Sequence, residues 1–442
     1  MSIVTVQIGQ CGNQVGEQLF STIAEDTYGK YSGVGVKDNE TYKTEVEKCF
    51  FTLSEKGPPK AKAVLVDMEP KVIAQCKTNA KRSGLWSYND SSSFCQKRGS
   101  GNNWAHGYFK HAQNASINVM ELLRKEVEKC DHLGGFLVLM SLAGGTGSGV
   151  GAYLSQTIRD EFPNSFIANQ IVWPYNTGEV IVQNYNAILT LSHLYNSSDA
   201  ILIFENDHMQ KMCTQLMGIK NISFRDINKV ICHHLAGGLL RTNGFLNCNR
   251  LKTNHLGDVL EHLVSHPDYK LLTMRAIPLM SQHSKAYSSY NWPGLLKHLR
   301  QMLVANAAME EGIDWNVKVS EGKFRTFNKS VANLMFLRGK DIASPDISAF
   351  QDSRLYPDWI PPGCALETWT QPRCFHQYEK AAIMLSNSQS PVGPLNHVIS
   401  KAWGMFSSRA YVHQYTNHGM AEENFLDAFT SLEQVLKNYK DL

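Results

Sequence analysis

The sequence predicts an α/β protein with three parts. The N-terminal part is a doubly wound parallel sheet, the middle part is a mixed α/β domain, and the C-terminal part is a helical hairpin. Short, uninterrupted apolar runs such as 136–140 are typical of strands buried on both faces of a parallel sheet. Glycine-rich turns follow several of these runs and lead into helical patterns. Beyond Pro394 the apolar residues recur at helical spacing throughout.

Length and composition narrow the classes of protein. At 442 residues the chain is long enough for two or three domains, and its net charge of +3 gives no electrostatic argument for nucleic acid as a partner. Ten scattered cysteines, without Cys-x-x-Cys pairs or metal-ligand spacing, favour the reduced cytosol over a disulfide framework. No window approaches the roughly 20 apolar residues of a membrane span, so no membrane partner is expected.

The motif at 141–149, Ser-Leu-Ala-Gly-Gly-Thr-Gly-Ser-Gly, is the centre of the prediction. It follows the strand at 136–140 and precedes a helical pattern with one apolar stripe, formed by Val150, Tyr153, Leu154, Thr157 and Ile158. Glycines let the backbone approach a ligand without a Cβ atom, and free N–H groups at a helix start attract phosphate. The loop lacks the Gly-x-x-x-x-Gly-Lys-Ser/Thr spacing of a P-loop.

Three further segments come before this motif in the chain. Residues 3–8 predict a strand, and the glycines after it mark a turn into a helix whose start is a second phosphate site. Residues 26–60 are polar and weakly periodic, which predicts a long surface loop. Residues 63–66 predict a strand that ends at Asp67 and Glu69, two carboxylates suited to Mg²⁺. The alternative for Asp67 is that it caps the following helix.

The rest of the chain completes three predicted domains. A glycine turn at 96–103, a helix around 115–128 and strands at 170–173 and 200–204 complete a first domain at 1–204. Strand-like runs at 271–274 and 332–337, with a helix at 293–308, predict a core helix and mixed α/β domain at 205–386. Residues 387–442 form the helical domain.

These motifs resemble the tubulin superfamily, whose signature is Gly-Gly-Thr-Gly-Ser-Gly. The resemblance rests on that signature, on Gly9-Gln-Cys-Gly-Asn-Gln14 and on Gly101-Asn-Asn-Trp104, and it runs from residue 1 to about 439. Within the family the chain is most similar to the delta type, through 173–186, 189–195 and an end at Leu442 where alpha- and beta-tubulins continue into an acidic tail. The resemblance implies a tubulin-like GTPase domain that binds GTP or GDP with Mg²⁺, with Glu69 as the direct metal ligand.

The same resemblance assigns nucleotide contacts to matching positions. The 96–103 loop would sense the terminal phosphate, the segment after strand 170–173 would hold the ribose, and two asparagines and a phenylalanine would read the guanine. The matching positions are Gln10, Cys11, Gly99, Ser100, Gly101, Asn102, Ser141, Ala143, Gly144, Gly145, Thr146, Gly147, Glu179, Gln183, Asn206, Phe224 and Asn228. Without the resemblance, Cys11 and Phe224 would be interpreted as core residues and Asn228 as an exposed polar residue.

Hydrolysis needs a group that the first domain does not supply in any evident way. In tubulins a helix on one subunit closes over the nucleotide of the next subunit, and Asp258 matches the position of the catalytic glutamate of alpha-tubulin. Asp258 would therefore orient water in trans. The alternative is a solvated helix carboxylate.

The resemblance implies a cytoskeletal protein of the cytoplasm that acts at centrosomes, centrioles and ciliary basal bodies, in triplet microtubule formation and ciliary function. Its partners would be other tubulins (alpha, beta, epsilon or itself) and centriolar proteins. A GTP-binding structural subunit without hydrolysis, or another minor tubulin of the gamma or epsilon type, stays open. A dinucleotide-dependent metabolic enzyme is the remote alternative, because the Gly-x-Gly-x-x-Gly spacing is missing from the first turn.

Overall fold

The computed structural model describes residues 1–29, 34–54, 57–178, 180–240, 242–244, 254–281, 284, 290–320, 327–342, 345–361, 363–376 and 378–442. Its contacts group the chain into two units. The first unit consists of Met1–Ser21, Glu47–Asp207 and Pro391–Asp441, and the second of Thr22–Val46, His208–Ser390 and Leu442. The predicted division at 204 and 386 stays a prediction.

The first unit contains a parallel sheet with strand order β5-β4-β1-β6-β7-β8. The first strand, β1, lies inside the sheet. The next two strands of this sheet, β4 and β5, are added on one side of β1, and β6, β7 and β8 are added on the other side. This is the predicted doubly wound sheet, and its order reverses between β1 and β6. The strands are β1 (Ser2–Ile8), β4 (Ala63–Asp67), β5 (Ser93–Cys95), β6 (Leu133–Ser141), β7 (Ile167–Trp173) and β8 (Ala200–Glu205).

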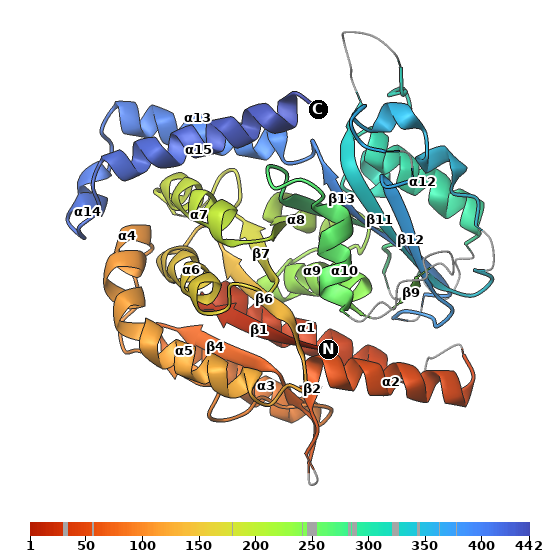
Figure 1. Ribbon diagram of the computed structural model, residues 1–442, viewed down its shortest axis with the longest axis horizontal. Helices are drawn as coiled ribbons and strands as arrows, with labels where there is room; N and C mark the ends of the chain where they lie inside the picture. The colour runs from red at the N-terminus through yellow and green to blue at the C-terminus, as the bar shows by residue number, and fades with distance from the viewer. Residues whose placement is uncertain are drawn as a thin grey trace. The chain divides into compact units, whose positions relative to one another are not determined.

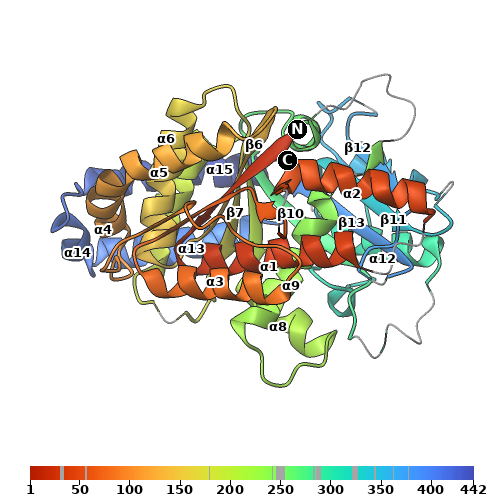
Figure 2. The ribbon, with the colours of Figure 1, turned by 90° about the horizontal axis from the view of Figure 1, so that it is seen from below.

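Helices cover both faces of this sheet, which is why its central strands are buried along almost their whole length. Figure 2 shows α1 and α3 on one face and α5 and α6 on the other. The helical elements are α1 (Gly9–Tyr28), α3 (Pro70–Ser83), α4 (Trp104–His106), a π-helical turn η1 (Gly107–Ala112), α5 (Gln113–Val127), a second π-helical turn η2 (Thr146–Val150), α6 (Gly151–Glu161), α7 (Gln183–Ser197) and α8 (Asn206–Gln215).

The prediction of a surface loop at 26–60 is wrong. The structure has a helix, α2 (Val36–Phe50), followed by the antiparallel pair β2 (Phe51–Thr52) and β3 (Lys60–Ala61). Three apolar residues of α2, spaced by four, are buried: Tyr42, Val46 and Phe50. The stripe is one residue wide, so tertiary burial stabilises a helix whose overall composition is polar.

The second unit is mixed α/β, as predicted. Its strands lie in the order β10-β13-β11-β12-β9, with β11 and β12 parallel and the other pairs antiparallel. Helix α12 contributes Leu295, Leu299 and Met302 to a hydrophobic core, where they lie with strand residues such as Met335 and Met384. The elements are α9 (Phe224–Leu239), β9 (Asn243–Gly244), α10 (His255–Leu263), β10 (Leu271–Ile277), α12 (Trp292–Val304), β11 (Ser330–Gly339), β12 (Leu366–Gln371) and β13 (Lys380–Ser388), with 3₁₀ turns at Glu310–Gly312, Ser348–Phe350 and Ser353–Leu355.

The C-terminal residues form the predicted helical hairpin. It consists of α13 (Val392–Ser407), the short α14 (Val412–Thr416) and α15 (Glu423–Lys440). The two long helices pack on each other and on α7 of the first unit (Figure 1). Aromatic rings fill the contact, with Tyr185 of α7 only 4.8 Å from Phe425 of α15 between ring centroids.

Candidate functional site

The candidate site begins where the sheet order reverses, at the carboxyl ends of β1 and β6. Gly9 follows β1 with φ +73°, and a Cβ atom there would lie 2.9 Å from the backbone nitrogen of Gly147. The loop after β1 and the loop after β6 are therefore in direct backbone contact. Only glycine allows both the positive φ and this approach. Ligands of doubly wound sheets bind at this position of the fold.

The loop after β5 joins the same place. The Ser100 hydroxyl lies 3.0 Å from the Thr146 hydroxyl. A Cβ atom on Gly145 would lie 2.7 Å from both the backbone nitrogen and the carbonyl oxygen of Asn103. The structure therefore brings together the three glycine turns that the sequence singled out separately. Gly101 and Asn102 adopt left-handed conformations with φ +59° and +53°, which make the sharp bend of this turn.

The electrostatics of this edge favour an anion. The first turn of α1, which the structure describes in full, contains no acidic residue, so the positive end of the helix dipole is not compensated there. Gln10 is exposed in that turn, and Cys11 is half-buried. Desolvation raises the pKa of the Cys11 thiol to about 12, so Cys11 is a neutral, weakly polar group at neutral pH.

The two predicted metal ligands follow β4 directly. Asp67 is buried, and its carboxylate accepts a hydrogen bond from the backbone N–H of Met68 at 2.7 Å. Desolvation raises the pKa of Asp67 to about 6, while the N–H groups of Met68 and Glu69 lower it. The N-cap position before α3 is Glu69, and its side chain makes no capping hydrogen bond; Asp67 therefore does not cap this helix.

Glu69 reaches the turn after β5. Its carboxylate oxygen Oε1 would lie 2.5 Å from a Cβ atom on Gly99, so the acid and the predicted phosphate-sensing turn are neighbours. Among the described residues no group of three or more His, Cys, Asp or Glu side chains is placed to hold a metal ion by itself. An Mg²⁺ ion beside Asp67 and Glu69 would therefore take its other ligands from water and phosphate oxygens, which is its usual preference.

The predicted ribose contacts lie between β7 and α7. Glu179 is outside the described residues. Gln183 is buried at the start of α7, and its amide donates to the carbonyl oxygen of Tyr175 at 2.8 Å, so this side chain braces its own loop. The backbone N–H of Asn176 donates to Asp207 at 3.0 Å, which ties the same loop to the end of β8. Asn206, beside that anchor, is half-buried.

The remaining predicted residues belong to the second unit. Phe224 begins α9 and is 56% exposed, and Asn228 is buried one turn further along that helix. A capping box between Ser223 and Asp226 fixes the start of α9. Asp258 lies in the first turn of α10 and is half-buried.

Sequence reasoning missed the residues that connect the turns after β5 and β6. Asn186 is completely buried in α7 and bonds to two of the loops, and Tyr415 of α14 donates to Asn186. Asn103 caps α4 by accepting from the N–H of His106 at 2.9 Å. The sequence carries little signal for this role, because Gln183 and Asn184 stand beside Asn186 and only the fold shows which of these amides is fully buried.

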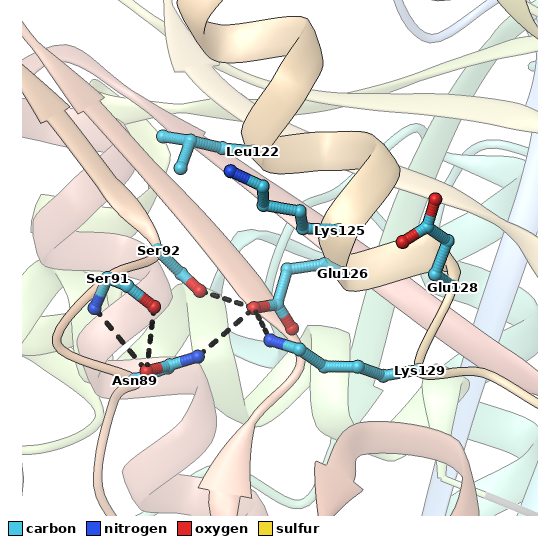
Figure 3. Close-up of a pocket in the computed structure, with 8 residues that line it drawn as sticks. All are labelled: Asn89, Ser91, Ser92, Leu122, Lys125, Glu126, Glu128 and Lys129. Carbon is cyan, nitrogen blue, oxygen red and sulfur yellow. Dashed lines mark hydrogen bonds and ion pairs between the residues drawn. The ribbon is translucent and has the colours of Figure 1, made fainter.

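A separate pocket of about 390 Å³ lies between α5 and the loop at 89–92 (Figure 3). Its floor is the buried carboxylate of Glu126, which accepts from Ser92, from Asn89 at 3.5 Å and from Lys129 at 2.5 Å. No predicted nucleotide residue lines this pocket. None of the helices in the described part of the chain is long and apolar enough to cross a membrane.

Comparisons with known proteins agree with this geometry. A family model described as Tubulin/FtsZ family, GTPase domain, matches residues 2–214. The chain is similar to the tubulin delta chains of Macaca fascicularis and Homo sapiens, each 52% identical over 453 residues and covered completely, as is this chain. It is also similar to the tubulin beta-1 chain of Chondrus crispus, with 28% identity over 99% of this chain and 93% of the relative.

Proposed function

This chain belongs to the tubulin family as a GTP-binding member of its delta type, and we propose that it acts at centrioles and basal bodies, in triplet microtubule formation and ciliary function. Full-length identity of 52% with delta chains carries the assignment to the delta type. The proposed role at centrioles and basal bodies rests on the resemblance of this chain to delta-type tubulins. The family match sets aside the dinucleotide-dependent enzyme.

Nucleotide binding rests on the three interlocked turns. As a member of the family the chain binds GTP or GDP and interacts with other tubulins. In the proposed assignment the turns at 9–11, 99–102 and 141–147 surround the phosphates with backbone N–H groups. Asn206 and Asn228 read the guanine edge, Phe224 stacks on the base, and Glu179 and Gln183 face the ribose.

The proposed magnesium site consists of Asp67 and Glu69 beside the phosphates. Both carboxylates leave the end of β4, and Glu69 touches the turn at Gly99, which supports the assignment. Magnesium would neutralise charge on the phosphate oxygens. Glu69 would contact the ion directly, and Asp67 would hold its water ligands.

Hydrolysis is proposed to require a second subunit. In this proposal Asp258 orients the attacking water on the nucleotide of the subunit that its α10 helix caps. Its place in the first turn of an amphipathic helix, with Leu256, Val259 and Leu260 buried, supports the proposal because the apolar side anchors the helix. The partner would be alpha-, beta- or epsilon-tubulin or a second copy of this chain. It is identified as the subunit whose GTP turnover rises when this chain is added.

The variant Asp258→Ala tests this role. We expect it to lower assembly-stimulated GTP turnover about 100-fold, the lower end of what a positioned acid or base contributes. Single-turnover hydrolysis, measured alone and with alpha/beta-tubulin, is the readout. Glu261→Ala removes an exposed carboxylate from the same helix and should leave turnover unchanged. Unchanged turnover in Asp258→Ala would end the proposed role, whereas a wild-type chain without turnover, alone and with alpha/beta-tubulin, would favour a structural GTP-binding subunit.

The centriolar role has its own test. A tagged copy should concentrate at centrioles and basal bodies of cells that build triplet microtubules, and depletion should leave triplets incomplete. Electron microscopy of cross-sectioned basal bodies measures this. Complete triplets after verified depletion would contradict the proposed role without affecting the assignment to the family.

A further inference from the structure

The side chain of Asn186 has all of its hydrogen-bonding positions occupied while it is 0% exposed. Its amide nitrogen donates to the carbonyl oxygens of Asn102, at 2.8 Å, and Ala143, at 2.7 Å. Its oxygen accepts from the backbone N–H of Trp104, at 3.0 Å, and from the hydroxyl of Tyr415, at 2.6 Å. A carboxamide has two donors and one oxygen with two lone pairs, so no capacity is left over.

The two donors connect loops that the sheet alone does not connect. Asn102 lies in the turn after β5, and Ala143 lies in the turn after β6. One rigid amide that bonds to both carbonyls fixes the spacing between these turns. The backbone N–H groups of these two turns are among those to which the proposed function assigns phosphate binding. Asn186 therefore connects, through their carbonyl oxygens, two of the turns that are proposed to bind phosphate.

The C-terminal helices hold this connection in place through α14, which lies beside α4 (Figure 1). Besides the Tyr415 hydroxyl, the Asn103 amide donates to the carbonyl oxygen of Gln414 at 3.1 Å. The rings of His106 and His418 stack at 4.4 Å with an angle of 10° between their planes. Burial keeps the pKa of Tyr415 well above its usual range, so its hydroxyl remains a donor.

We propose that Asn186 is the positioning residue of the phosphate loops and that Tyr415 orients it, so that GTP affinity depends on a hydroxyl of the C-terminal helices. Tyr415 acts through Asn186 and does not touch the nucleotide. The loop at Asn102 is the one assigned to the terminal phosphate. Loss of the hydroxyl therefore weakens GTP binding more than GDP binding. The inference rests on the GTP and GDP binding of the family.

The variant Tyr415→Phe tests the proposal in the full-length chain. It removes one hydroxyl and keeps the ring among Tyr185 and Phe425, with centroids at 5.5 and 5.3 Å. We expect the dissociation constant for GTP to rise about tenfold, the upper end for one neutral hydrogen bond, and that for GDP to rise less. Equilibrium titration with GTP and with GDP measures both.

The matched control is Tyr185→Phe. The Tyr185 hydroxyl donates to the carbonyl oxygen of Ala410 at 3.0 Å, so this variant also removes one bond between α7 and the C-terminal segment. The acceptor of the Tyr185 hydroxyl, Ala410, lies outside the turns that are proposed to bind phosphate. Both variants should lower the thermal midpoint similarly, and only Tyr415→Phe should change nucleotide affinity.

Asn186→Asp provides a second arm. The carboxylate still accepts from Trp104 and Tyr415, but it faces the carbonyl oxygens of Asn102 and Ala143 without a proton to donate, so GTP affinity should fall further than in Tyr415→Phe. The proposal is overturned if Tyr415→Phe binds GTP within twofold of the wild type, or if Tyr185→Phe weakens binding equally. A wild-type chain that binds no GTP would instead contradict the nucleotide binding of the family.

Discussion

Gly145→Ala should weaken GTP binding roughly 150-fold. Its Cβ atom would lie 2.7 Å from the backbone nitrogen and the carbonyl oxygen of Asn103 and from the Cβ of Ser100. These are backbone or near-backbone atoms, so no side-chain rotation relieves the contact. The turn after β5 must move away, which changes the spacing between the turns that are proposed to bind phosphate. Overpacking of this kind costs about 3 kcal/mol, which corresponds to a roughly 150-fold loss of affinity.

The neighbouring glycine is the control for this prediction. A Cβ atom on Gly144 meets only Asn102 Oδ1, at 3.8 Å, which is ordinary contact. Gly144→Ala should therefore keep the thermal midpoint of the nucleotide-free protein within about 2 °C of the wild type. Thermal unfolding and GTP titration of the two variants side by side make the measurement. If Gly145→Ala bound GTP with wild-type affinity, the close contact with Asn103 and Ser100 would not limit GTP binding, and the prediction would be wrong.

Arg373→Met should strongly destabilise the second unit. Arg373 Nη1 lies 2.6 Å from Asp26 Oδ2, and each side chain is 2% exposed. The Tyr42 hydroxyl also donates to Asp26, at 3.0 Å, and the guanidinium lies 4.4 Å from the centre of the Tyr42 ring. Removing Arg373 leaves the carboxylate buried without its nearest cation. Breaking one side of such a pair costs about 3–5 kcal/mol, measurable as a lower urea midpoint.

An exposed pair in the same unit is the control. Lys340 and Glu379 lie 2.8 Å apart with side chains 51% and 72% exposed, so Lys340→Met should leave the urea midpoint unchanged. The double variant Asp26→Leu with Arg373→Met should be more stable than Arg373→Met alone, since no unpaired charge is left buried. An equal or lower stability of the double variant would mean that packing, and not the charge pair, explains the loss.

Several elements could be predicted from local pattern. The buried strands of the first unit are short, largely apolar runs, the helix after 150 and the C-terminal helices repeat apolar residues at about 3.6, and the structure confirms these elements. The α2 helix was missed because only Tyr42, Val46 and Phe50 carry its period. The glycine turns were identifiable because positive φ and close backbone approach both favour glycine, as at Gly9.

Local pattern by itself determined the strands, the turns and the family signature, because each depends on residues adjacent in the chain. Only the tertiary structure decided how the turns interlock and what holds them. Asn186 and Tyr415 are 229 residues apart, and Asn103 and Gln414 are 311 apart. A hydrogen bond over such a separation leaves no periodicity in the sequence, because its geometry exists only after the sheet and the hairpin have packed together.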